Sequence, residues 1–405
     1  MSKLSASSAA PLLQRRRLLV TLLAGAGVIV LPACGGGGGG VAGVDTGGTG
    51  SFSAGRISGF GTGSVIVNGV RYQDGAARIT NADDATALQP RDLKLGMVVR
   101  IRAGATSAGG AGNPPTATAT EITVETQVKG PVASKTAPDT LVVLGQTVKV
   151  DAATVFAGTT FAAIAVGDLL EVSGFANAAG VITASRIESE DATSEFRVRG
   201  AISNLDTAAK TFTVGTASFD YSGAGVRLPS TALANGLFVR VRTRPAQNAD
   251  GAWIVTRIDL RENEVEDSDE AKVEGILVQN GSVLSVNGIR IDTSRLPAGT
   301  ALPVGLQVEV EGEIVDGVLF ANAIEVEDED EEAEVDVRGE VSALDTGART
   351  FVVRDVTFHY TPGATEEKDG TFAADLRNGA TVRVRGTLPA GGAGNVEASE
   401  VDFRI

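Results

Sequence analysis

The sequence contains little of the chemistry on which most enzyme sites depend. Its 405 residues include one cysteine, Cys34, and one histidine, His359. A lone cysteine forms no intrachain disulfide, and the usual zinc sites need more ligands than these two residues supply. His359 lies at a position that is aspartate or glutamine in other copies of a repeat described below, which indicates a polar strand residue. We therefore predict no catalytic residue, no metal ligand and no cofactor.

Aromatic residues and positive charge are also scarce. Aromatic side chains make up 4% of the chain, with one tryptophan, and the formal net charge is −15. Nucleic-acid binding depends on cationic side chains that neutralise phosphates and often on rings that stack on bases. We therefore predict no nucleic-acid partner. Paired carboxylates for glycoside hydrolysis stay open because acids are plentiful, although the sequence indicates no deep cleft for them.

No apolar run is long enough to span a bilayer, but a shorter one lies near the N-terminus. Arg15, Arg16 and Arg17 precede a mostly apolar stretch of fourteen residues that ends at Leu31. A charged segment, an apolar segment and then small residues are typical of a secretory signal peptide. A buried helix is the alternative, but Pro32 and the following glycines would end it. We predict a signal peptide over residues 1–33, exported in either the unfolded or the folded state.

The stretch Leu31-Pro32-Ala33-Cys34 resembles the lipobox of bacterial lipoproteins. The resemblance implies that Cys34 is acylated, with palmitate among the attached chains, and that the mature protein begins there. Gly35 in the next position implies transfer to the outer membrane of the cell envelope. Residues 34–53 are mostly Gly, Ala, Thr, Ser and Val, which is typical of a flexible tether.

An internal repeat dominates the rest of the chain. Segments of the form Gly-x-x-Val-x-Val, or close variants, begin at five glycines that lie 71, 69, 69 and 74 residues apart: Gly96, Gly167, Gly236, Gly305 and Gly379. A strand pattern that contains a glycine precedes each segment, and a strand of small residues ending in Ile or Val follows it. Three markers in one order indicate tandem copies of one unit.

Each copy also carries a hairpin pattern between its first strand and its Gly-x-x-Val segment. Asn68-Gly69 and Asn287-Gly288 suit a two-residue type I′ turn. Flanking residues alternate between apolar and polar, so each strand has one buried face. Small sheets expose hydrogen-bonding edges unless they close. We predict an all-β fold of five tandem small antiparallel β-barrels, of OB-like or SH3-like size, in a beads-on-a-string array.

The predicted barrels, called repeats 1 to 5, have the following bounds: residues 54–126, 127–190, 195–262, 271–327 and 335–405. The first copy, which reads GRISGFGTGSVIVNGVRY from Gly55, resembles the domain of unknown function DUF5666, which is often found behind a lipobox. The resemblance covers the chain from about residue 54 onward. It implies a β-rich exported repeat and supplies no activity, ligand or site residue.

Charged residues follow two patterns. Acids gather between repeats, in Glu188–Asp191, Glu262–Glu274 and Glu325–Asp336, which indicates solvated linkers or, alternatively, loose divalent-cation binding. The Gly-x-x-Val strands of repeats 1, 3 and 5 carry arginine on their polar side, whereas those of repeats 2 and 4 carry glutamate. Adjacent barrels would then offer opposite faces for docking, or the faces would simply be solvated.

These patterns point to a non-enzymatic, lipid-anchored envelope protein that acts as a spacer, scaffold or adhesive surface. Its partners would be the membrane, through Cys34, and an envelope protein or glycan. The alternative is a binding module for a polysaccharide, cell-wall component or small ligand through variable loops. Those loops follow the Gly-x-x-Val strands and are long in three copies: residues 103–119, 244–252 and 388–398.

Overall fold

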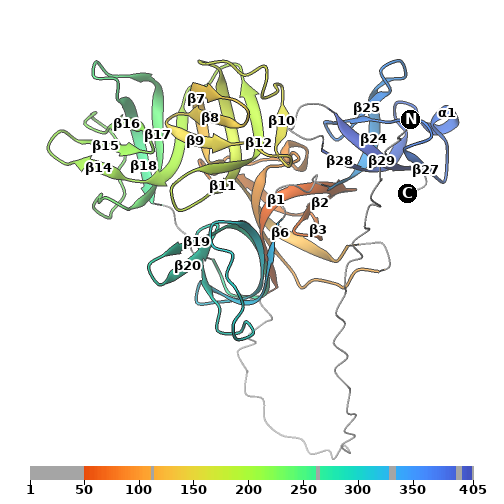
Figure 1. The fold of residues 1–405 in the computed structure, drawn as a ribbon, viewed down its shortest axis with the longest axis horizontal. Coiled ribbons are helices and arrows are strands. Elements are labelled where there is room, and N and C mark those ends of the chain that lie inside the picture. The colour runs from red at the N-terminus through yellow and green to blue at the C-terminus, as the bar shows by residue number, and fades with distance from the viewer. Residues whose placement is uncertain (1–49, 111–113, 261–264, 328–333, 389–394, 404–405) are drawn as a thin grey trace, which may run out of the picture. The chain divides into compact units, whose positions relative to one another are not determined.

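The computed structural model describes residues 50–110, 114–260, 265–327, 334–388 and 395–403. The predicted signal peptide, Cys34 and most of the tether lie outside these residues. Residues Thr46–Ile405 form one compact unit, and the regular secondary structure of its described part is nearly all strand (Figure 1). The all-β prediction is therefore confirmed. No helix among the described residues has the length and apolar character needed to cross a bilayer.

Repeat 1 is a closed barrel of five strands. These are β1 (Ser51–Gly61), β2 (Ser64–Val67), β3 (Val70–Gln73), β5 (Val98–Ala103) and β6 (Thr116–Glu125). β1 pairs with β2, β2 with β3, β3 with β6, β6 with β5, and β5 with β1 again. A short strand, β4 (Arg78–Asn81), lies beside β6, and the 3₁₀ turn η1 (Pro90–Asp92) precedes β5.

The same order of pairing recurs in repeats 2 and 3. Repeat 2 consists of β7 (Val128–Thr136), β8 (Thr140–Val143), β9 (Gln146–Lys149), β10 (Val155–Ala157), β11 (Leu169–Ala176) and β12 (Ile182–Glu190). Repeat 3 consists of β13 (Phe196–Ala201), β14 (Ser203–Asp206), β15 (Thr211–Val214), β16 (Ala217–Asp220), β17 (Phe238–Gln247) and β18 (Trp253–Leu260). Its first strand is divided into β13 and β14.

Repeats 4 and 5 follow the same order. Repeat 4 consists of β19 (Ser268–Asn280), β20 (Val283–Val286), β21 (Ile289–Asp292), β22 (Gln307–Val315) and β23 (Val318–Val326). Repeat 5 consists of β24 (Glu334–Asp345), β25 (Thr350–Val353), β26 (Val356–His359), β27 (Glu366–Lys368), the single helical turn α1 (Phe372–Asp375), β28 (Thr381–Thr387) and β29 (Val396–Asp402). In Figure 1 the strands of repeat 4 curl into a ring.

In each repeat, one of the strand pairings that close the barrel is parallel. The sequence predicted barrels with antiparallel pairings only. In repeat 1 the parallel pairing is that of β3 with β6, and in repeat 4 it is that of β21 with β23. The reason is geometric, because a closed ring with an odd number of strands cannot alternate in direction all the way round. The resulting order, first–second–third–fifth–fourth, is that of the five-stranded Greek-key barrel of the OB fold.

The repeated glycine has one backbone conformation. Gly96, Gly167, Gly236, Gly305 and Gly379 have φ values of 78°, 97°, 85°, 89° and 83°. Residues with a side chain rarely adopt such values, because the Cβ atom collides with the backbone. The Gly-x-x-Val pattern therefore marks the left-handed turn that begins the fourth strand of each circuit. The predicted hairpin turns are also present, with positive φ at Asn68, Gly69, Asn287 and Gly288.

Strands of repeat 1 pair with strands of repeats 4 and 5, whereas a beads-on-a-string array predicts contacts between neighbours. The first half of β1 pairs in parallel with β19, from Ser51 opposite Glu270 to Ala54 opposite Val273. Farther along, β1 pairs with β24, with Gly59 opposite Asp336. These contacts cover edges of β1 that its own barrel leaves open.

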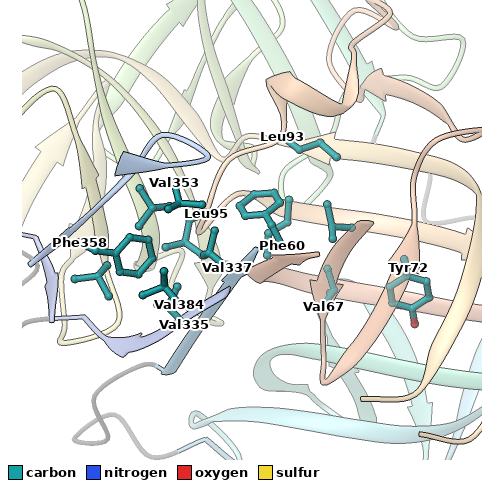
Figure 2. Close-up of a cluster of buried hydrophobic side chains, with 14 of the residues drawn as sticks. Phe60, Val67, Tyr72, Leu93, Leu95, Val335, Val337, Val353, Phe358 and Val384 are labelled. Carbon is teal, nitrogen blue, oxygen red and sulfur yellow. The ribbon is translucent and has the colours of Figure 1, made fainter. Parts of the chain in front are cut away.

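The hydrophobic cores are shared in the same way. Side chains of repeats 1 and 5 form one buried cluster in which Phe60 and Val337 meet (Figure 2). Repeats 2 and 3 share a second cluster. Phe52 and Ala54 of β1 belong to the cluster of repeat 4. For this reason β1 begins at Ser51, within the residues predicted as tether, because its first residues are buried against another repeat.

Candidate functional site at the junction of repeats 1 and 3

Of the residues that the sequence singled out for chemistry, the structure describes His359 but not Cys34. His359 lies on β26, where its Nδ1 is 2.9 Å from Glu397 Oε2, and both side chains are partly exposed. Cys34 lies outside the described residues. No cluster of three or more metal-ligating side chains occurs within the described ranges. The acidic stretches predicted as linkers or cation sites fall partly on residues 261–264 and 328–333, outside those ranges.

The arginines on the polar side of the Gly-x-x-Val strands are not solvated in isolation. Those of repeat 1, Arg100 and Arg102 on β5, line the same hollow as Arg240 on β17 of repeat 3. The equivalent pair in repeat 5 lies elsewhere and contacts Asp336 and Glu400 of its own barrel. The docking of arginine faces on glutamate faces, one of the two alternatives from the sequence, is not observed between the Gly-x-x-Val strands in the described part of the chain. Glu171 and Glu309 instead pair with Lys129 and Lys272 of their own repeats.

Asp83 is the carboxylate on which the two repeats converge. It follows β4 in a turn in which its backbone N–H donates to Asn81 Oδ1 at 2.7 Å. Its side chain is 1% exposed, and Arg199 Nη2 on β13 donates to its Oδ1 at 3.0 Å. Arg197 and Arg240 lie within 3.5 Å and 3.7 Å of the same carboxylate. Three arginines of repeat 3 therefore surround one acid of repeat 1.

Arg199 is the most deeply buried cation of this cluster, with a side chain 4% exposed. Besides Asp83, it lies 3.5 Å from Glu125 Oε1 on β6, which is itself 3.0 Å from Arg100 Nε. Burial alone would lower the pKa of Arg199, but Glu125 and Asp83 outweigh that effect and raise it. The charge of Arg199 is therefore retained at all ordinary pH values and is stabilised across the junction.

The pKa of Arg240 shifts in the opposite direction. Burial, followed by the repulsion of Arg199, lowers the pKa of Arg240 despite the proximity of Asp83 and Asp259. Its Nη1 donates to the carbonyl of Ala82. Asp83 and Asp259 nevertheless lie 3.7 Å and 3.9 Å from Arg240, so its charge has partners in both repeats.

A hollow of about 520 Å³ lies beside this cluster. Its wall is formed by β5 and β6 of repeat 1, by β13, β17 and β18 of repeat 3, and by a loop at Pro229 and Ser230. The lining includes five arginines and three carboxylates: Arg100, Arg102, Arg199, Arg240, Arg257, Glu121, Glu125 and Asp259. The volume lies in the range typical of small-molecule sites.

Sequence reasoning missed several of these residues. Asp83 lies in the polar stretch Asn81–Thr86, which has no pattern that distinguishes it from an exposed loop. Arg197 and Arg199 alternate with apolar residues on β13, and that alternation does place them on the polar face. Nothing in the sequence indicates that this face meets repeat 1. The predicted variable loops contribute no residue to the described wall of the hollow.

Comparison with known proteins finds a family model that matches some of the repeats. The model of a domain of unknown function, DUF5666, matches residues 129–188, 264–325 and 338–402. Three tandem segments, in repeats 2, 4 and 5, therefore match this domain, whereas the match does not include repeat 1, on which the sequence resemblance was based. A search of curated proteins finds no match.

Among solved structures, the chain is similar to one titled "drosophila Unr CSD456", with 13% sequence identity and a TM-score of 0.13. The likeness covers 53% of this chain and 98% of that one. A TM-score of this size carries no argument about function.

Proposed function

We propose that this chain is a non-enzymatic, lipid-anchored protein of the bacterial cell envelope, in which tandem β-barrels form a scaffold. The observation that carries the scaffold is the pairing of β1 with β19 and with β24, because these strands join repeats distant in the sequence. Repeats held by strand pairs present a fixed surface, whereas repeats on flexible linkers do not.

Polar contacts support the same scaffold. The buried carboxylate of Glu274 in repeat 4 accepts a hydrogen bond from the backbone N–H of Arg56 at 2.8 Å and lies 3.2 Å from the Nε of that residue. Ser185 of repeat 2 donates to the carbonyl of Gly96 at 2.7 Å. Together with the Asp83 cluster and the pairing of β1 with β24, these contacts connect repeat 1 to every other repeat.

The anchor rests on the lipobox resemblance at Cys34, and fractionation of cells tests it. Cys34→Ala should move the protein from the membrane fraction to the soluble fraction, because the acylated sulfur is lost. Gly37→Ala, in the glycine run just after the lipobox, serves as the matched control and should stay with the membrane. Retention of Cys34→Ala in membranes after a salt wash would refute the anchor.

Capture of partners tests the scaffold role. The full chain, purified in detergent, is incubated with envelope extract, and bound material is analysed for protein and for sugar. A stoichiometric protein partner supports a scaffold. Bound glycan with no protein would support the alternative, a binding module for envelope polymers, and would count against the scaffold.

A further inference from the structure

The hollow between repeats 1 and 3 has a charge that differs from the rest of the molecule. Five arginines and three carboxylates line it, whereas the whole chain carries a formal charge of −15. Two further acids contact these arginines from beside the hollow: Asp83 at Arg199 and Arg240, and Glu266 at Arg102. The charges around the hollow are therefore close to balanced, whereas the molecule as a whole is acidic, and a recess without excess negative charge repels anions less than the rest of the surface does.

Several guanidinium nitrogens at the hollow have no hydrogen-bond partner within the described ranges. These are Nε and Nη2 of Arg100, Nε of Arg199 and Nε of Arg240. Arg100 Nε lies 3.0 Å from Glu125 Oε1, but the contact lacks hydrogen-bonding geometry. Arg199 is 4% exposed, so its unpaired N–H is a buried donor at the wall of the hollow. Buried donors without partners are costly, and a bound acceptor would satisfy them.

The geometry points to a ligand of a definite class: we propose that this hollow binds a small molecule carrying at least two oxyanion groups, phosphate or carboxylate. Guanidinium groups present paired donors that match the oxygens of these groups. We specify two groups because the donors belong to two repeats, with Arg100 and Arg102 on β5 and Arg199 and Arg240 on β13 and β17. The site rests on the arrangement of repeats 1 and 3 in the proposed scaffold, but it does not depend on the anchor or on capture of an envelope partner.

A neutral sugar fits this wall poorly. Phe52 is the only aromatic residue among the described residues that line the hollow, and it is 5% exposed, so it offers little surface for stacking. A long nucleic-acid strand would meet the acidic remainder of the protein outside the recess. The unpaired guanidinium donors and the size of the hollow therefore favour a compact polyanion.

Titration calorimetry with the full chain in detergent tests the proposal. Inorganic pyrophosphate and propane-1,2,3-tricarboxylate are the probes, and they separate phosphate from carboxylate chemistry. We expect binding of at least one probe that weakens as salt rises. Absence of binding for both probes at millimolar concentration would overturn the proposal, as would tighter binding of a single-stranded oligonucleotide than of either probe.

Arg100→Gln should weaken binding of the probe by roughly tenfold or more, since it removes a charged donor. Arg383 holds the same position in repeat 5, four residues after the repeated glycine, and lies away from the hollow. Arg383→Gln is therefore the matched control and should bind as the wild type does. Equal effects of the two substitutions would contradict the proposal.

The Arg257→Gln variant tests whether a loss of binding is caused by unfolding of the protein. This arginine lines the hollow with a side chain 39% exposed, so its replacement disturbs little packing. We expect weakened binding with an unchanged melting temperature. Unchanged binding in both Arg257→Gln and Arg100→Gln would show that the probe binds elsewhere.

Discussion

Arg199 donates a hydrogen bond to Asp83 at 3.0 Å, across 116 residues of sequence and between two repeats. Both side chains are almost fully buried. A buried charge is tolerated when its partner is held in place, and removal of one partner leaves the other without compensation. The pair therefore couples the folded structure of repeat 3 to that of repeat 1.

Asp83→Asn should lower the free energy of unfolding by about 3–5 kcal/mol, because Arg197, Arg199 and Arg240 lose their shared carboxylate. Urea denaturation measures this loss. Asp84→Asn is the neighbouring control. Asp84 pairs with Arg197 at 3.1 Å but is 28% exposed, so we expect a loss of about 0–1 kcal/mol. Equal losses at the two positions would show that Asp83 has no special role.

Gly59→Ala should separate β1 from β24. A Cβ atom at Gly59 would lie 2.3 Å from the carbonyl oxygen of Asp336, which is closer than any real contact. Amide hydrogen exchange at Asp336, whose backbone groups face β1, should then become at least roughly tenfold faster, because local opening is facilitated. Gly75→Ala is the control, since a Cβ there meets nothing within 4 Å. Unchanged exchange at Asp336 would contradict the β1–β24 pairing.

Asp74→Asn should stabilise the protein near neutral pH. Asp74 is 1% exposed, and its carboxylate oxygens have no hydrogen-bond partner within the described part of the chain. Burial raises the pKa of Asp74 above its ordinary value of 3.8, although Arg354 opposes the shift. The protonated form is therefore favoured by folding, and the stability it brings is present below pH 3.8 and lost as the pH rises through the folded-state pKa.

The gain from Asp74→Asn should be on the order of 1 kcal/mol at pH 7, and it should shrink as the pH falls toward 4. Thermal melting at a series of pH values measures it. Asp250→Asn, at an exposed turn, is the control and should change the melting temperature little. A gain for Asp74→Asn that persists unchanged at pH 4 would mean that ionisation of Asp74 is not its cause.

The repeat and its barrel follow from local signals in the sequence. The spacing of Gly96 and its equivalents predicts tandem units, because each of these glycines has a φ that other residues avoid. Alternation along each strand predicts which face is buried, and Asn68-Gly69 predicts a tight hairpin. These signals depend on residues close together in the chain, so they can be recognised in a single sequence.

The junctions between repeats do not follow from such signals. Alternation on β13 separates a polar face from an apolar one, but Arg199 on the polar face is buried because repeat 1 covers it. Similarly, the composition around Phe52 predicts a tether, but the Phe52 side chain packs in the hydrophobic core of repeat 4. Contacts over such separations depend on the fit between complete surfaces.

Zero-length carbodiimide crosslinking followed by mass spectrometry tests most directly whether the repeats form one scaffold. Lys94 of repeat 1 and Asp355 of repeat 5 form an ion pair across the junction, and Lys272 Nζ lies 3.0 Å from Glu309 Oε1 within repeat 4. Our account predicts that dilute monomer yields both crosslinked peptides. A Lys272–Glu309 crosslink without any Lys94–Asp355 crosslink would contradict it.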